Sequence, residues 1–464
     1  MKKILIHILL IAPAILLSSC WENFLEKKPD QKLVVPTTLQ DLQALLDNIS
    51  NDMMNTDPSL HFLASDDFHI TASGFQSLSV IQQNSYLWEK DVYNGTLTVQ
   101  DWVRPYQQVF YANVVLESLG ALENQANRKT EWNNVKGSAL FFRALAFYNI
   151  AQLFRTPYDE SSARKAAGIP LKLQSDINIL AISSTLWQTY DQIIRDLTEA
   201  ELLLPVNVTV KTRPAKSAAL ALLARVNLSM ENYAEAEQYA DRTLAFNSQL
   251  LDYNTLTESS NKPFPGSLPF GNEEVIFHTV LYGGYSYIGN AQVYVDSSLF
   301  KEYTDADLRK TLFFRNRAGG ILTFKGSYSP SLPGNPFAFF GGLATDEMYL
   351  IRSECRARKG DIQGAMVDLN DLLIKRWRRG MYQARSTTDK EEALLMILLE
   401  RRKQLVGRST RWTDLRRLNK DPRFAVSIKR AINGKLYVLA PGDKRYTFPL
   451  PDNEVGNIVM QNPR

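Results

Sequence analysis

Residues 346–376 predict two helices joined by a short turn, in the sequence DEMYLIRSECRARKGDIQGAMVDLNDLLIKR. Ser353 and Ala365 lie twelve residues apart, one in each predicted helix, on either side of the turn at 359–362. Small residues at these two positions let antiparallel helices approach closely. Ile362 follows the turn and would pack between them, with Leu373 further along. A single hairpin of this kind cannot bury its apolar face, so it has to stack on neighbouring hairpins.

A second hairpin of the same kind is predicted at residues 215–246. Ala224 and Ala236 are again twelve residues apart, and Tyr233 and Leu244 stand at the offsets of Ile362 and Leu373. This pattern is typical of tetratricopeptide repeats, in which helical hairpins stack on one another. The two hairpins lie far apart in the sequence. A stack that contains both must therefore be interrupted by a long insertion.

The remaining chain supports a mainly α fold, a tetratricopeptide-repeat-like helical scaffold with long irregular loop insertions and a few short strands. Repeat helices are predicted at about 98–155, 186–246, 346–380 and 390–420. A loop-rich insertion occupies about 252–345, and within it only Glu274–Thr279 and Ile321–Phe324 resemble strands. Irregular segments of this length in a compact protein usually carry function.

The N-terminus predicts a lipoprotein signal peptide over residues 1–19. Lys2 and Lys3 precede an apolar run that ends in Leu17-Ser18-Ser19, directly before Cys20. We expect the Cys20 thiol to carry a diacylglycerol, with 20–36 as a tether and 37–464 as a single domain. An ordinary signal peptide with a chance cysteine is the alternative. The apolar run is shorter than the roughly 20 residues that a spanning helix needs.

Composition excludes several function classes. The formal net charge of +4 falls to +2 when Lys2 and Lys3 leave with the signal peptide, which is too balanced to indicate nucleic-acid binding. Cys355 is the only cysteine besides Cys20, so neither an internal disulfide nor a cysteine-based metal site is expected. No cofactor motif is present.

Ligand-binding candidates come from two sets of residues. Aromatic side chains among glycines and serines are free to stack on sugar rings, whose C–H faces are apolar, and early polar residues would add hydrogen bonds. The aromatic candidates are Phe75, Tyr282, Tyr285, Tyr287 and Tyr328, and the polar candidates are Asp66, Asp67 and His69.

Catalysis finds little support in the sequence. The histidines of the mature chain, His61, His69 and His278, are not spaced as a metal pair on one helix. No nucleophile elbow is present. We therefore expect no enzyme, although carboxylates are numerous and a glycosidase pair stays open as an alternative. Charges of alternating sign follow near the C-terminus, and we expect them to form ion pairs that lock the last helices to the repeats: Glu400, Arg401, Arg402, Arg411, Asp414, Arg416 and Arg417.

The chain as a whole resembles the SusD/RagB family of outer-membrane nutrient-binding lipoproteins. The resemblance begins after the lipid cysteine and continues through the late repeat to the C-terminus, where it is most specific. Two departures stand there: Gln404 replaces a common acidic residue, and the usual glycine before Arg411 is missing. The matching segments are Asn23–Glu26 with Lys28-Pro29, Pro36–Thr38, Tyr86–Trp88, Glu347–Glu354, Ile397–Lys403, Arg411–Arg417, Tyr446–Pro451 and Gln461–Pro463.

The resemblance implies a lipid-anchored protein on the outer membrane, facing the cell surface. It implies an oligosaccharide or another oligomer as ligand and a SusC-like TonB-dependent transporter as partner, which the protein caps while it delivers the ligand for import. A periplasm-facing repeat scaffold that binds other proteins is the second hypothesis, and a glycan-degrading enzyme is the third. The ligand itself, glycan or peptide, stays open.

Overall fold

The structure is a computed structural model that describes residues 36–48, 53–54, 56–122, 128–179, 181, 183–266, 271–285, 292–329, 338–456 and 460–464. Cys20, the signal peptide and nearly all of the tether lie outside the described residues, as does Tyr287. Leu39–Arg464 forms one compact unit, to which the following description applies. Within the described ranges, no helix has both the length and the apolar character needed to cross a membrane.

Helices make up most of the regular structure, as the repeat pattern predicts. They are α2 (Leu39–Leu46), α3 (Leu60–Ala64), α4 (Ala72–Gln76), α5 (Val80–Tyr86), α6 (Gln100–Ala121), α7 (Lys129–Phe154), α8 (Leu186–Leu203), α9 (Lys216–Ser229), α10 (Tyr233–Phe246), α11 (Ser297–Lys301), α12 (Arg309–Phe313), α13 (Thr345–Lys359), α14 (Ile362–Ile374), α15 (Lys390–Gln404) and α16 (Arg411–Leu418).

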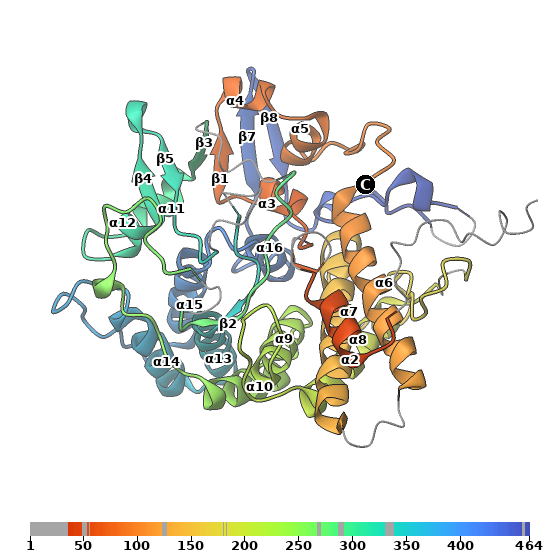
Figure 1. Cartoon of the computed structure of the whole chain (residues 1–464). Helices are drawn as coiled ribbons and strands as arrows, with labels where there is room; N and C mark the ends of the chain where they lie inside the picture. Colours follow the sequence, from red (N-terminus) through yellow and green to blue (C-terminus); the bar gives the residue numbers. More distant parts are fainter. Residues whose placement is uncertain are drawn as a thin grey trace, which may run out of the picture. The chain divides into compact units, whose positions relative to one another are not determined.

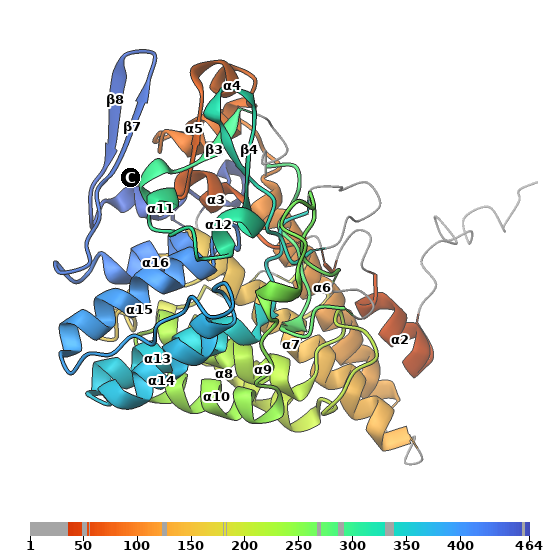
Figure 2. The ribbon, with the colours of Figure 1, turned by 90° about the vertical axis from the view of Figure 1, so that its left-hand side faces the viewer.

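The long helices stack in pairs. Each helix from α6 to α10 packs on the next one along the chain, and α10 then packs on α13, which also contacts α14 and α15 (Figures 1 and 2). Nearly a hundred residues separate the end of α10 from the start of α13, yet the two helices are direct neighbours. The predicted fold class, a tetratricopeptide-like scaffold interrupted by a long insertion, is confirmed.

The contacts inside the last hairpin explain why its sequence is diagnostic. Ser353 and Ala365 are fully buried, and the Ser353 hydroxyl donates a hydrogen bond to the Ala365 carbonyl oxygen at 2.8 Å. Gly360 ends α13 with a φ of +96°, a left-handed conformation that glycine adopts without strain. The Asp361 carboxylate then caps α14 by accepting the Gly364 N–H at 2.9 Å. Close approach, turn and cap are thus all encoded locally.

Within the described residues, the strands form four separate antiparallel pairs. The β1–β3, β4–β5 and β7–β8 pairs lie on one side of the stacked helices (Figure 1), whereas β2 and β6 contact α9. Two pairs, β1 with β3 and β2 with β6, join distant segments. The sequence indicates the region of β2 and of β5, but β1, β3, β4 and β6 have only two or three residues each and show too little alternation to be recognised. The β7–β8 hairpin was missed although its strands have five residues each and flank Asn433-Gly434, a pair that favours a hairpin turn. The strands are β1 (Phe68–Ile70), β2 (Val275–Phe277), β3 (Val293–Val295), β4 (Phe314–Asn316), β5 (Leu322–Phe324), β6 (Leu343–Ala344), β7 (Ile428–Ile432) and β8 (Lys435–Leu439).

The alternating charges near the C-terminus form buried ion pairs, as expected from the sequence. Arg401 Nε lies 2.9 Å from the Asp414 carboxylate, and Arg417 Nη1 lies 2.6 Å from Glu354 on α13. These pairs tie α15 and α16 to the last repeat. Arg416 is the exception, because it forms no ion pair with any residue that the structure describes.

Candidate functional site

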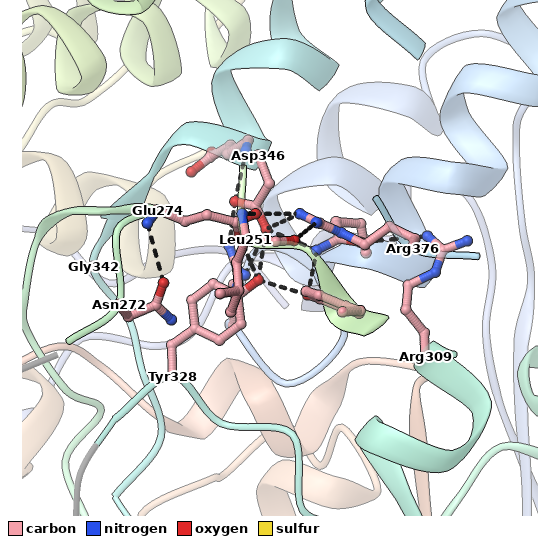
Figure 3. Close-up of polar contacts among 12 residues, drawn as sticks. Leu251, Asn272, Glu274, Arg309, Tyr328, Gly342, Asp346 and Arg376 are labelled. Atoms are coloured by element: carbon pink, nitrogen blue, oxygen red, sulfur yellow. Dashed lines mark hydrogen bonds and ion pairs between the residues drawn. The ribbon is translucent and has the colours of Figure 1, made fainter. Parts of the chain in front are cut away.

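A buried polar network holds the insertion against the last repeat (Figure 3). Glu274, just before β2, accepts hydrogen bonds from Arg376 Nη2 at 2.6 Å, from the Leu251 N–H at 2.8 Å and from the Tyr328 hydroxyl at 2.7 Å. Arg376 also donates to the Leu251 carbonyl oxygen at 2.9 Å. Burial raises the pKa of Glu274. The network therefore fixes three parts of the insertion to the end of α14.

Asp346, at the start of α13, is the second acidic centre of this network. Burial opposes its ionisation, but a bidentate pair with Arg408, at 2.7 and 2.6 Å, holds the pKa of Asp346 below its usual value. Gln404 donates to Asp346 at 2.8 Å and accepts from Arg376 Nε at 3.1 Å. A carboxylate at position 404 could not donate this bond, so the departure from the family pattern has a local role.

Tyr328 belongs to the network and its ring is covered. Its side chain is 1% exposed, its hydroxyl contacts Glu274, and the Arg408 guanidinium lies 4.0 Å from the ring centroid. Phe75 is also buried, with its ring 6.0 Å from that of Tyr86. Both residues are ligand candidates from the sequence, but in this structure neither ring presents a face to solvent.

Two of the polar candidates lie in ion pairs, and the third, His69, is hydrogen-bonded to a carboxylate. Asp66 accepts two hydrogen bonds from Arg411, at 2.7 and 2.8 Å, and Arg411 holds its pKa below the usual value although burial opposes this. Asp67 is buried beside Arg402 at 3.0 Å, and burial raises its pKa. His69 is half-buried and lies 2.9 Å from Asp296. Asp66 and Asp67 therefore join the early loop to the C-terminal helices.

Tyr282 and Tyr285 pack together at the N-terminal end of α6. Their rings meet edge to face with centroids 5.2 Å apart, and the Arg104 guanidinium lies 4.5 Å from the Tyr282 ring centroid. The Tyr285 hydroxyl accepts the Gln100 N–H at 3.2 Å, and burial raises the pKa of Tyr285 to about 12. Tyr285 is buried, whereas Tyr282 is half-exposed. Among the described candidates, Tyr282 is the aromatic ring that solvent reaches most readily.

A groove follows the outer face of the same helix. The segment 170–175 runs beside α6 because three residues of one helical face hold it. The Tyr106 hydroxyl donates to the Pro170 carbonyl oxygen at 2.8 Å, Asn113 donates to the carbonyl oxygens of residues 172 and 174, and Glu117 accepts the Ser175 N–H at 2.8 Å. Spacings of seven and four residues place these side chains along one stripe.

The groove has a volume of about 520 Å³, within the range of small-molecule sites. Its apolar lining includes Phe110 on α6, which is 38% exposed, and Ile177 and Ile179 after the segment 170–175, which are 86% and 51% exposed. Lys172 lies 5.0 Å from the ring centroid of Tyr106. The remaining polar lining residues are Gln107, Asn113, Gln174, Ser175, Asp176 and Glu454.

This combination can bind a ligand that has both apolar faces and hydroxyl or amide groups. Large exposed apolar side chains in a concave site mark a binding surface more often than a structural one. Within the described ranges, no group of histidine, cysteine, aspartate and glutamate residues is arranged to hold a metal ion. The aromatic, aliphatic and polar lining of the groove is suited to binding by shape, stacking and hydrogen bonds.

Sequence reasoning did not find this groove. Phe110 follows Trp102 and Tyr106 at intervals of four, a spacing that places the three rings along one face of a helix and does not distinguish a packed ring from an exposed one. The sequence feature that could have indicated the groove is the segment 176–179, in which Ile177 and Ile179 alternate with Asp176 and Asn178 outside any helix. Isolated apolar residues in a polar segment need no explanation by themselves, so the signal is weak without the fold.

Two family models match separate parts of the chain. A family model described as "Starch-binding associating with outer membrane" matches residues 23–228, and the model of the SusD family matches residues 345–458. SusD-like protein P2 of Formosa agariphila is 26% identical over 197 residues, which cover 42% of this chain and 36% of that protein. The match thus spans little more than a third of that relative's length.

Solved structures share the fold over nearly the whole chain. A SusD superfamily protein from Bacteroides thetaiotaomicron superposes with a TM-score of 0.73 at 22% identity, covering 92% of this chain and 100% of that one. A SusD-like carbohydrate binding protein from Bacteroides vulgatus superposes with a TM-score of 0.67 at 20% identity, covering 90% and 96%. At these identities the likeness establishes the fold.

Proposed function

The chain belongs to the SusD/RagB family, and on this premise we propose that it is a lipid-anchored outer-membrane protein that binds a nutrient oligomer. Family membership suggests glycan binding at the outer membrane. In this proposal the ligand is an oligosaccharide, and the protein delivers it to a SusC-like TonB-dependent transporter.

The groove beside α6 carries the proposal. Its volume of about 520 Å³ suits a ligand of a few sugar units, and Phe110 offers an aromatic face on which a pyranose ring can stack. Gln107, Gln174 and Glu454 supply hydrogen-bonding groups at its edge. A flat peptide strand would instead require a row of unpaired backbone groups. A groove that combines an aromatic stacking face with scattered polar groups therefore favours a glycan over a peptide as its ligand.

Tyr282 extends the proposed binding surface. Its ring lies against Arg104, one turn of α6 from Gln107, which lines the groove. A longer oligosaccharide could contact both Phe110 and Tyr282. Asp66, Asp67, Phe75, Tyr285 and Tyr328 would then act as a framework that supports these loops, since their side chains are engaged and buried. His69 and Tyr287 remain candidate contacts for the ligand.

The anchor and the partner complete the proposal. A lipidated Cys20, followed by the tether 20–36, would hold the domain at the membrane while allowing it to move relative to a transporter. No catalytic role is part of this proposal, because recognition and delivery need only reversible binding.

The test uses the mature domain on a glycan array, followed by calorimetric titration of the oligosaccharide that binds best. Phe110→Ala should weaken binding at least about tenfold, because the lost stacking surface contributes about 1.5 kcal/mol or more. The matched control is Phe246→Ala, which removes another exposed phenylalanine, at the end of α10 and outside the groove. Equal affinities for both variants would exclude the groove as the glycan site.

The partner is tested separately by affinity purification of the tagged lipoprotein from gently solubilised outer membranes. Near-equal recovery of a TonB-dependent barrel is the expected result. Recovery of periplasmic proteins alone would instead support the alternative of a periplasm-facing scaffold, and release of shortened glycan products during the titrations would support the enzyme.

A further inference from the structure

The groove beside α6 is lined mainly by apolar side chains. Of the three aromatic rings in its lining, only that of Phe110 is exposed. A sugar ring in the groove therefore has one stacking face and meets aliphatic side chains elsewhere. The apolar lining residues are Trp102, Val103, Tyr106, Val109, Phe110, Leu171, Leu173, Ile177, Ile179 and Ala181.

Much of the hydrogen-bonding capacity of the groove is used within the protein. Asn113 donates two hydrogen bonds to the segment 170–175, at 2.9 and 3.1 Å, and accepts one from Arg143 at 3.0 Å. The Tyr106 hydroxyl donates to the same segment, and the Ser175 hydroxyl donates to a carboxylate on α6. These polar groups hold the groove together and are not available to a ligand.

Few polar side chains of the lining are left to bind a ligand. Gln107, Gln174 and Glu454 form no hydrogen bond or ion pair with any residue that the structure describes. An unsubstituted sugar ring carries several hydroxyl groups, and each of them loses water when it enters the groove. A hydroxyl group that finds no protein partner there weakens binding. The groove therefore disfavours a glycan whose hydroxyl groups are all free.

The charged lining residues oppose an anionic ligand. Asp176 and Glu454 contribute carboxylates, whereas Lys172 contributes a single cation. The undescribed residues that border this lining in the sequence, at 180, 182 and 457–459, carry no charge. A sugar acid or a sulfate ester would meet an excess of like charge in the groove. Any substituent on the glycan should therefore be uncharged.

We propose that the groove binds an O-acetylated oligosaccharide. Acetyl esters are uncharged, they replace hydroxyl donors that the groove cannot satisfy, and they add methyl groups that Ile177 and Ile179 can cover. A ring of the same chain stacks on Phe110. This inference rests on the proposed function, because it names the class of glycan that the same groove takes.

The test is an array of O-acetylated xylan, mannan and pectin fragments, each printed beside its alkali-deacetylated form and probed with the mature wild-type protein. Calorimetric titration of the pair that binds best then gives both affinities. Deacetylation should weaken binding about fourfold for each acetyl methyl group that the groove buries.

The outcomes separate this inference from the proposed function. Equal or tighter binding of the deacetylated form would overturn the inference and leave the proposed function intact. So would binding to neither form of any pair when another, unacylated glycan binds. Binding to no glycan at all would overturn the proposed function as well, and with it the inference.

Two substitutions locate the acetyl groups. The double variant Ile177→Ser, Ile179→Ser should remove the difference in affinity between the acetylated and deacetylated forms, and it should fold because both side chains are exposed. Ile374→Ser is the matched control, since it removes another exposed isoleucine, at the end of α14 and outside the groove, and should keep the difference. A double variant that still prefers the acetylated form as strongly as the wild type does would overturn the proposal.

Discussion

Nη2 of Arg376 lies 2.6 Å from Oε1 of Glu274, and neither side chain has any exposed surface. Arg376 follows α14 in the last repeat, and Glu274 precedes β2 inside the insertion, 102 residues earlier in the chain. The pair directly links the repeat scaffold to the loops that cover it (Figure 3).

Arg376→Met should lower the free energy of unfolding by about 3–5 kcal/mol, because Glu274 would be left as an uncompensated buried charge. Urea denaturation followed by circular dichroism measures this loss. Arg378→Met is the matched control two residues away. Its partner Glu258 and Arg378 itself are both partly exposed, so the control should lose less than about 1 kcal/mol. Similar losses in both variants would contradict a structural role for the buried pair.

Asp101 should make stability depend on pH. It is the second residue of α6 and accepts the N–H groups of Ser59 and Leu60 at 2.8 and 2.7 Å, and burial raises its pKa from 3.8 to about 7. Between these two values the folded state holds a proton that the unfolded state has lost. The contribution of Asp101 to the free energy of unfolding is therefore fully present at low pH. It declines by about 1.4 kcal/mol per pH unit as the pH rises toward 7.

Asp101→Asn keeps the accepting oxygen and removes the titration. The difference in unfolding free energy between wild type and variant should change by about 1.4 kcal/mol per pH unit between pH 5 and 6. His61 and His278 act in the opposite direction, since burial lowers the pKa of each to about 4, but their effect is common to both proteins and cancels. Parallel stability curves would show that Asp101 does not titrate in this range.

Gly342 is predicted to tolerate no side chain. A Cβ atom at this position would lie 2.1 Å from the Phe277 carbonyl oxygen in β2, and the backbone there cannot move without breaking the β2–β6 pair. Gly342→Ala should cost about 1–3 kcal/mol of stability, measured by thermal or urea unfolding. Gly120→Ala, in the last turn of α6 with nothing nearby, should be neutral or stabilising by up to about 1 kcal/mol. A larger loss of stability for Gly120→Ala than for Gly342→Ala would argue against the close approach of Gly342 to the Phe277 carbonyl oxygen.

Cys20→Ala should release the protein from the membrane, because acyl chains on Cys20 are the proposed anchor. Detergent phase partitioning of whole-cell extracts measures this, and the variant should move to the aqueous phase. Cys355→Ala is the control, since it removes the only other cysteine, which is buried in α13. Retention of the Cys20→Ala variant in the detergent phase would require another anchor.

Local sequence was sufficient for the helical hairpins. The paired small residues, the glycine that ends α13 and the cap of α14 all act within about fifteen residues of one another, so they can be recognised without knowing the fold. The ion pairs of the C-terminal helices were also predictable in kind, since alternating charges on buried helices have to neutralise one another.

The candidate site was less accessible to sequence reasoning, because exposure is a property of the fold. Aromatic residues among glycines and serines looked free to bind a ligand, yet Phe75, Tyr285 and Tyr328 are buried in the folded protein. Conversely, Phe110 fits a helical stripe but faces the groove. Composition around a residue does not reveal which distant segment will cover it.

By itself the sequence determined the helical repeats, the interruption between them and the resemblance to the SusD/RagB family, since each rests on residues close together in the chain, and it predicts a lipoprotein-type N-terminus. Only the tertiary structure decided that α10 packs on α13, that Arg376 meets Glu274, that a groove opens beside α6 and that Arg416 has no carboxylate partner in the described ranges. Those contacts join segments tens to hundreds of residues apart. Their geometry depends on how all the intervening side chains pack, which no local pattern specifies.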